Sequence, residues 1–157
     1  MNVDEKLYTY ILENGIDFNK LTFTSDGTYV RYDTSDDDCE QVLFTGLTYE
    51  LQHNGDLWYY CYYKKGVRNG FCKFFYNNGN VKSEMNMENG VIHGKMIEYY
   101  REGNIESISY YYQGERLEYV KYDKDKNIVA CEELDENHPK KKYVEILKKS
   151  DEFFIEI

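Results

Sequence analysis

The sequence predicts a mainly β protein, built as a meander of repeated β-hairpins that form an elongated, curved sheet with a short helix capping each end. Composition is the first reason, because aromatic residues make up 17% of the chain, with 18 tyrosines and a single proline. Such a mixture favours strands over helices or disorder. The second reason is that glycines recur at a fixed interval, as in stacked copies of one small unit.

The glycine series has a period of 24 residues. Gly46, Gly70 and Gly94 open successive units, and two further glycines follow at matching positions within each unit. An aliphatic residue also recurs in each unit, as Leu57, Val81 and Ile105. We therefore assign a structural role to nine of the 11 glycines, which are Gly46, Gly55, Gly66, Gly70, Gly79, Gly90, Gly94, Gly103 and Gly114.

Each unit has the pattern of a β-hairpin. Asn54-Gly55 and Asn78-Gly79 lie between alternating aromatic and aliphatic segments, which predicts a two-residue type I′ turn at each hairpin tip. Gly66, Gly90 and Gly114 then turn the chain into the next hairpin. The units predict six strands over residues 46–118, stabilised by stacking on their neighbours.

The flanking segments complete one domain over residues 1–157. Residues 1–45 predict a helix over 4–13, ending at Asn14-Gly15, followed by an acidic segment with a hairpin at Asp26-Gly27. Residues 119–157 predict a degenerate fourth hairpin, a helix beginning near Pro139, and a terminal strand or apolar tail, "FFIEI". In the second helix the spacing aligns Tyr143, Ile146 and Leu147 on one face.

Charge is concentrated at one end of the chain. The formal net charge is −10, and residues 1–60 hold 12 acidic against 3 basic side chains. This argues against direct binding of nucleic acid and favours a basic protein partner, although the charge could equally serve solubility. The run containing Asp36, Asp37 and Asp38 either binds such a partner or is a solvated loop.

Catalytic and metal-binding motifs are missing from the sequence, so we expect neither an enzyme nor a cofactor nor a bound metal. Asp123, Asp125 and Asn127 have the opening spacing of a calcium loop, but Ile128 and Leu134 replace its essential Gly and Glu. The four cysteines have no CxxC spacing and predict free, mostly buried thiols. The amino terminus lacks the pattern of a signal peptide, and no apolar run is long enough to span a membrane, so we expect a cytoplasmic protein.

Aromatic side chains alternate along the predicted strands and supply candidate binding residues. One face collects Cys72, Phe74, Met85 and Met87 and is predicted to be core. The other face is rich in tyrosine and tryptophan, whose apolar rings and polar tips suit an interface. These rings could instead form cross-strand ladders that stabilise the sheet. The candidate binding residues on this face are Trp58, Tyr60, Tyr62, Tyr99, Tyr110 and Tyr112.

The repeats resemble MORN-type repeats, and specifically the bacterial YwqK-type antitoxin or immunity family. The resemblance rests on "LFTGLTYELQHNGDL" (residues 43–57), "GFCKFFYNNGNVKSEMNMENGVIHG" (residues 70–94) and "GKMIEYYREGNIESISYYYQG" (residues 94–114). It implies a non-enzymatic cytoplasmic protein that binds and neutralises a cognate toxin. With the acidic first third, it suggests a basic toxin such as a nuclease or deaminase. The alternative is a MORN-repeat scaffold that recruits proteins or touches a lipid surface through its lysine-rich C-terminal helix.

Overall fold

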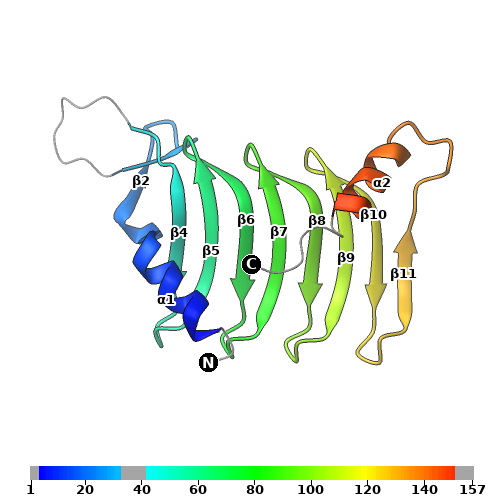
Figure 1. Ribbon diagram of the computed structural model, residues 1–157, viewed down its shortest axis with the longest axis horizontal. Helices are drawn as coiled ribbons and strands as arrows, with labels where there is room; N and C mark the ends of the chain where they lie inside the picture. Colours follow the sequence, from blue (N-terminus) through cyan, green and yellow to red (C-terminus); the bar gives the residue numbers. More distant parts are fainter. Residues whose placement is uncertain (1–3, 33–41, 151–157) are drawn as a thin grey trace.

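A computed structural model describes residues 4–32 and 42–150, which form a large curved sheet of mainly antiparallel strands with a helix at each end (Figure 1). From β4 onward each strand pairs with the next in the chain, which confirms the mainly β, hairpin-built fold. The elements are α1 (Glu5–Asn14), β1 (Gly15–Asp17), η1 (Phe18–Lys20), β2 (Leu21–Phe23), β3 (Val30–Tyr32), β4 (Gly46–Leu51), β5 (Leu57–Lys64), β6 (Val67–Phe75), β7 (Val81–Glu88), β8 (Val91–Tyr99), β9 (Ile105–Tyr112), β10 (Glu115–Tyr122), β11 (Ile128–Glu132) and α2 (Lys141–Ser150).

The first helix ends where the sequence predicts, but its closing glycine has a different role. The Asp4 side chain caps α1 by accepting a hydrogen bond from the backbone N of Lys6 at 3.0 Å. Gly15 is extended, with φ −99°, and starts β1, which pairs in parallel with β4. A Cβ at Gly15 would lie 2.7 Å from the carbonyl oxygen of Ile11. Glycine is therefore required at position 15 because the Ile11 carbonyl oxygen lies too close for a side chain, and not because the backbone is left-handed.

The hairpin tips are longer than predicted. In the first tip the backbone N of Gln52 donates to Asp56 O at 2.7 Å, and Gly55 N donates to Gln52 O at 2.9 Å. The same pair of bonds recurs at Tyr76–Asn80 and Tyr100–Asn104. Three residues thus separate the strands and only the glycine has positive φ, which is the geometry of a type I turn with a bulge. The predicted type I′ turn at the tips is wrong.

Type I′ geometry occurs instead at the opposite ends of the strands. Lys65-Gly66, Asn89-Gly90 and Gln113-Gly114 each combine a φ of 50° with a glycine φ between 79° and 85°. Gly66 has a second reason to be glycine, because an added Cβ would meet the Val30 backbone oxygen at 2.9 Å. The β2–β3 hairpin, which the Asp26-Gly27 signal predicted, is held there by Val30 N donating to Gly66 O at 2.9 Å.

Neighbouring hairpins are joined at their tips by side chains. Tyr76 donates its hydroxyl to Tyr99 O, and Tyr100 donates to Tyr122 O, each at 2.8 Å. The last of these bonds reaches the β10–β11 hairpin, which the sequence predicted as a degenerate fourth unit. Recurring turns and tip contacts are consistent with repeated units, while the 24-residue period stays an interpretation of the sequence.

The strand register defines two faces of the sheet. We call one the helix face, marked by the paired row Tyr49, Tyr60, Lys73, Glu84, Ile97, Ile108 and Val120. We call the other the hairpin face, marked by the row Thr48, Cys61, Cys72, Met85, Met96, Ser109 and Tyr119. Because side chains alternate along a strand, every residue two positions away on an unbroken strand shares its neighbour's face.

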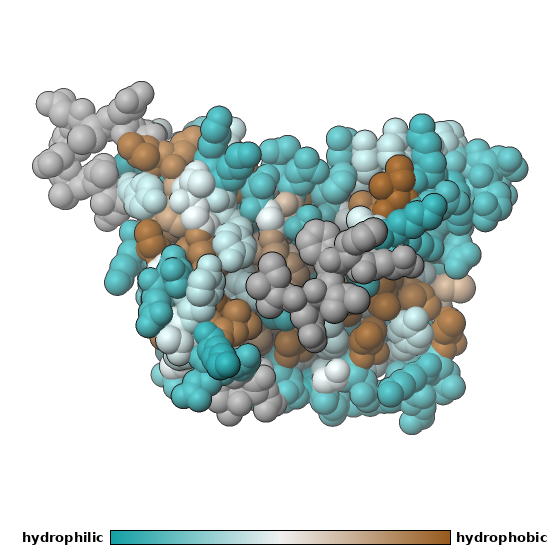
Figure 2. Space-filling model, viewed as in Figure 1, coloured by the Kyte–Doolittle hydropathy of each residue, from teal (hydrophilic) through white to brown (hydrophobic). Residues whose placement is uncertain are grey.

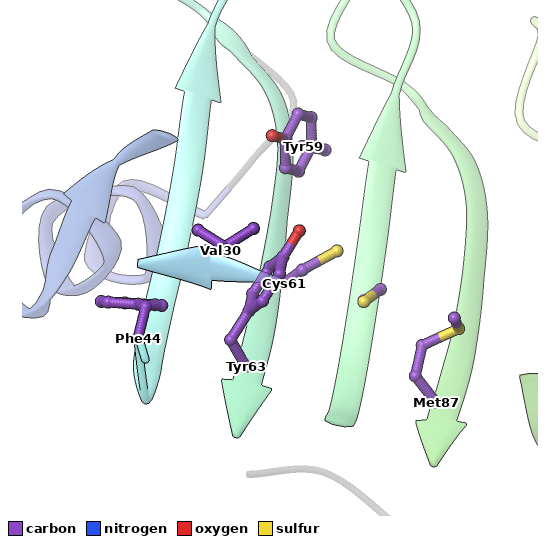
Figure 3. Close-up of a cluster of buried hydrophobic side chains, with 7 residues drawn as sticks. Val30, Phe44, Tyr59, Cys61, Tyr63 and Met87 are labelled. Atoms are coloured by element: carbon purple, nitrogen blue, oxygen red, sulfur yellow. The ribbon is translucent and has the colours of Figure 1, made fainter. Parts of the chain in front are cut away.

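Buried hydrophobic clusters lie on both faces, whereas the sequence predicted one core face. On the hairpin face Val30 and Phe44 pack on Tyr59, Cys61 and the β6–β7 residues Cys72 and Met87 (Figure 3). On the helix face Ile11 of α1 packs on Leu47, Leu57, Tyr60 and Phe75. The first strands are therefore the middle layer of a three-layer structure.

Candidate partner-binding surface

The first helix covers one end of the helix face. Ile11 is 1% exposed and lies on Leu47 and Leu57, while Leu7 and Tyr8 pack beside it. Tyr60, a predicted partner-binding residue, belongs to this cluster and is 6% exposed. Its ring is therefore part of the core beneath α1, and we do not place it on the binding surface.

The second helix is attached to the other end of the same face by a buried carboxylate. Glu118 on β10 is 2% exposed and accepts hydrogen bonds from Lys148 Nζ at 2.6 Å, Lys141 Nζ at 3.0 Å and Leu134 N at 3.2 Å. Burial opposes ionisation, but these hydrogen bonds outweigh it and hold the pKa of the Glu118 carboxyl below its ordinary value. Glu118 thus acts as a charged anchor for α2.

Aromatic stacking completes the attachment of α2. The rings of Tyr143 and Tyr112 stack with their centroids 4.5 Å apart, and Lys148 lies 5.3 Å from the ring centroid of Tyr110. Val144 is fully buried, whereas Ile146, which the sequence aligned with Tyr143, is 61% exposed. The predicted binding residues Tyr110 and Tyr112 are therefore partly covered by the protein's own helix.

Among the described residues, a strip of the helix face lies between the two helices and is covered by neither (Figure 1). Next to α1 it exposes three rings, Tyr10 at 50%, Tyr62 at 37% and Phe71 at 38%, which we call the aromatic patch. An added Cβ at Gly70 would lie 3.1 Å from Tyr62 Cβ, so Tyr62 lies close against β6 beside Phe71. Figure 2 shows this side of the molecule, with hydrophobic residues dispersed among hydrophilic ones.

Charged and polar groups border the aromatic patch toward α2. Lys73 Nζ lies 2.9 Å from Glu84 Oε2 and 5.6 Å from the Phe71 ring centroid, and Tyr99 donates its hydroxyl to Glu84 Oε1 at 2.7 Å. Burial, followed by the hydrogen bond to Glu84, raises the pKa of Tyr99, so its hydroxyl stays a neutral donor. This network fixes Lys73 and Tyr99 beside the patch.

The remaining predicted binding residues lie elsewhere. Trp58 is 49% exposed and packs its ring against Tyr59 in a T-shaped contact, with centroids 5.9 Å apart. Asp36, Asp37 and Asp38 lie outside the described residues, as does the terminal "FFIEI" segment. Partner binding by the predicted residues stays a prediction.

Sequence reasoning missed three residues of this surface. Tyr10 was not singled out as a contact residue within the helix predicted over residues 4–13, and its side chain is 50% exposed. Phe71 was not chosen as a contact residue either. Glu118 carried the clearest signal, because it stands where the glycine series would next place a glycine after Gly94.

The described residues offer little for metal or redox chemistry. They contain no group of three or more His, Cys, Asp or Glu side chains placed to hold a metal ion. The Asp123 carboxylate accepts hydrogen bonds from Asp125 N and Asn127 N, so the calcium-like motif forms a turn. Cys61 and Cys72 are buried free thiols on paired strands, and Cys131 is free and exposed. The hydrogen bond between the Cys61 and Cys72 thiols, and then burial, raise the pKa of the Cys61 thiol.

The lysine-rich C-terminal segment was the only predicted lipid-binding surface. Lys141 and Lys148 are paired with Glu118, and Lys140 is paired with Glu115. These ion pairs neutralise much of the positive charge that anionic lipid would need. In the part of the chain that the structure describes, neither helix is long and apolar enough to cross a bilayer.

Comparison with known proteins gives one informative similarity. The chain is 38% identical over 60 residues to "Immunity protein YwqK" of Bacillus subtilis (strain 168). The matched stretch spans 38% of this chain and 38% of the length of that protein. No family model matches the chain. No solved structure matches it either. The similarity therefore points toward the YwqK immunity proteins over a little more than a third of the sequence.

Proposed function

We propose that this protein is an immunity protein, which binds a cognate bacterial toxin and neutralises it without catalysis. The observation that carries the proposal is the 38% identity over 60 residues to an immunity protein. The fold supports it, because a stacked-hairpin sheet presents a broad, rigid surface to a partner. The cytoplasm is part of the proposal, since an immunity protein acts where the toxin would otherwise act.

The aromatic patch is the part of the helix face that suits binding best. Tyr10, Tyr62 and Phe71 are each more than a third exposed, and rings of this kind are common binding anchors at protein interfaces. The surrounding Lys73, Glu84 and Tyr99 are held by mutual contacts before any partner arrives. Prior fixing of these groups reduces the entropy cost of association.

The acidic first third supports a basic toxin as the partner. Its 12 acidic against 3 basic side chains would attract a positively charged surface and increase the association rate. A nuclease or deaminase groove has that character, because it binds nucleic acid. This proposal includes three further points. The toxin is a nuclease or deaminase, the repeats are of the MORN type, and Trp58 contacts the toxin together with Asp36, Asp37 and Asp38.

Co-expression with a toxin tests the function directly. A candidate toxin domain from the same genome is expressed in a bacterial host with and without the protein, and growth is measured. We expect the wild-type protein to restore growth and to co-purify with the toxin domain. Failure of the wild-type protein to restore growth, with both chains expressed, would contradict an immunity role for that pair.

The contact surface is tested in the same system. Tyr62→Ala and Phe71→Ala each remove an exposed anchor, and we expect each to cost about 2 kcal/mol of binding, or about 30-fold in Kd. Val129→Ala is the matched control, because Val129 is 56% exposed on β11, far from the patch along the sheet. Equal affinity of the patch variants and the control would place the interface elsewhere.

A further inference from the structure

The hairpin face is covered at one end and open at the other. The β2–β3 hairpin packs on β4–β6, and its hydrophobic cluster extends to Met85, Met87 and Ile92 but includes no residue of β9–β11. Beyond this cluster, toward β11, the face presents Met96, Tyr111 and Tyr119. Ser107 and Ser109 lie on the same face and are buried. Among the described residues this part of the sheet has no covering layer. Its floor is mixed, because Met96 and the two tyrosines lie beside the serines and Glu98, whose Oε2 accepts a hydrogen bond from Ser107 at 2.7 Å.

Two arginines border this open half, and neither is paired with a carboxylate of the described chain. On β6, Arg68 donates from Nε to the Tyr63 hydroxyl at 3.2 Å, and its guanidinium carbon lies 5.9 Å and 5.8 Å from the Tyr59 and Phe74 ring centroids. On β10, the guanidinium of Arg116 lies 4.3 Å from the ring centroid of Tyr119. Aromatic rings thus support both groups without neutralising their charge.

The absence of a carboxylate is informative because acidic side chains are plentiful. The chain has 29 acidic and 19 basic side chains, and on the helix face Lys73, Lys141 and Lys148 each have an acidic partner. A guanidinium that lies near aromatic rings and not against a carboxylate keeps N–H donors available for a carboxylate. The arrangement therefore suits carboxylates that come from another molecule.

We propose that the open half of the hairpin face, between Arg68 and Arg116, binds an extended segment of a partner protein that carries carboxylates beside apolar side chains. Four strand spacings separate β6 from β10, or roughly 19 Å, which about six extended residues would span. Met85 and Met96 lie between the two arginines, and their flexible thioethers adapt to varied apolar side chains. The binding does not require the partner to be a toxin.

Charge density favours a protein segment over the polyanions that would also attract arginine. At −10 the protein repels every anion, but the repulsion is much weaker for a few carboxylates than for a nucleic acid or an anionic bilayer. Discrete carboxylates spaced along a peptide suit two arginines that lie on strands about 19 Å apart. The two arginines are opposite in charge to the acidic first third, which is proposed to attract a basic toxin.

Methionine methyl groups offer a local readout. The chain has 4 methionines, of which Met85, Met87 and Met96 lie on the hairpin face. The full-length protein, labelled with ¹³C at the methionine methyls, is titrated with an alternating Glu-Leu octapeptide and, separately, with a Lys-Leu octapeptide. We expect the Met85 and Met96 signals to move with the acidic peptide and not with the basic one.

The four arginines of the chain supply a matched control. The double variant R68A/R116A removes the two proposed groups, whereas R31A/R101A removes the same charge from β3 and from the tip between β8 and β9. We expect R68A/R116A to bind the acidic peptide about tenfold more weakly or worse, and R31A/R101A to match the wild type. If the methyl spectrum shows that R68A/R116A is unfolded, R68K/R116K is tested in its place. Lysine keeps the positive charge but lacks the planar set of N–H donors of arginine, so we expect this variant to bind the acidic peptide several-fold more weakly than the wild type.

Several outcomes would overturn the proposal. Equal responses to the two peptides would show that apolar contact alone is responsible, and equal binding by the two double variants would remove the arginines from the site. Shifts produced only by phosphatidylglycerol vesicles or by a thymidine oligonucleotide would replace the peptide with a phosphate ligand. Shifts that grow with protein concentration in the absence of peptide would assign the face to a second copy of the chain.

Discussion

The two ends of the sheet are held together by different forces. At the first end, α1 lies on the helix face through Ile11, which is 1% exposed. The β2–β3 hairpin lies on the hairpin face through Val30, which is 3% exposed and packs with Phe44, 1% exposed, from the segment before β4. At the last end, α2 lies on the helix face through a buried carboxylate, two lysines and a tyrosine stack. Apolar burial responds little to pH, whereas an ion pair depends on it. The two ends of the sheet should therefore lose their packed helix or hairpin under different conditions.

The largest expected effect comes from the apolar end. Phe44→Ala removes a ring that packs against Tyr32 and Tyr63, with centroids 5.2 Å and 6.0 Å away. We expect a loss of about 3–5 kcal/mol in the free energy of unfolding, since a cavity replaces the ring. Urea denaturation measures it, with exposed Val129→Ala as the control expected to stay within about 0.5 kcal/mol. A loss for Phe44→Ala no larger than the control would show that this cluster does not support the first end.

The second prediction concerns the polar end. Glu118→Gln keeps the shape of the side chain and removes the charge that binds Lys141 and Lys148. We expect a cost of about 1.5–3 kcal/mol, the value of hydrogen bonds to a charged group, concentrated in the docking of α2. Hydrogen exchange of the α2 amides should accelerate while exchange in β5 and β6 stays unchanged. Glu102→Gln, at an exposed pair with Lys124, is the control and should leave α2 unaffected.

The same anchor predicts the direction of a pH response. Because the folded-state pKa of Glu118 is below its ordinary value of 4.5, its contribution is fully present above that value and is lost as pH falls through the folded pKa. The protection factors of the α2 amides, which correct for the intrinsic pH dependence of exchange, should therefore fall in acid before those of the Phe44 cluster. Glu118→Gln should abolish this selective loss of protection. If the variant retained it, other groups would control the docking of α2.

The smallest expected effect lies between the two ends, where hydroxyl groups join the hairpin tips. Tyr76→Phe removes the bond to Tyr99 O and should cost about 0.5–1.5 kcal/mol, as for a single neutral hydrogen bond. Thermal or urea unfolding measures it. Tyr29→Phe is the control, because the Tyr29 side chain is 39% exposed and its hydroxyl has no hydrogen-bond partner in the described structure. Indistinguishable stabilities would show that the tips are joined by backbone pairing alone.

Much of the fold was predictable because glycine is conformationally diagnostic. Positive φ at Gly55, Gly79 and Gly103 explains why turns fall where the sequence placed them. Turn type was not predictable, since Asn-Gly suits both a two-residue loop and the end of a three-residue loop. Here the amide of Asn78 donates to Arg101 O in the next tip, a contact between hairpins that a local pattern cannot reveal.

The candidate surface was less predictable than the fold. Alternation along strands assigned Tyr60, Tyr62 and Tyr110 to one face, and the register confirms that they share it. It could not indicate that α1 buries Tyr60 or that α2 partly covers Tyr110, because docking of a helix is a tertiary choice. Tyr10 shows the same limit, since the pattern that predicts the first helix does not indicate which of its aromatic rings points outward.

The position of Glu118 has a consequence for the length of the molecule. The anchor and the helix that it holds both belong to the last part of the chain, and from β5 onward each strand pairs only with its neighbours in sequence. A further hairpin inserted at the Asn89-Gly90 turn would carry the anchor and α2 along together, leaving α1 and the β2–β3 hairpin in place. The chain could therefore gain surface area one hairpin at a time while its two ends stay as they are.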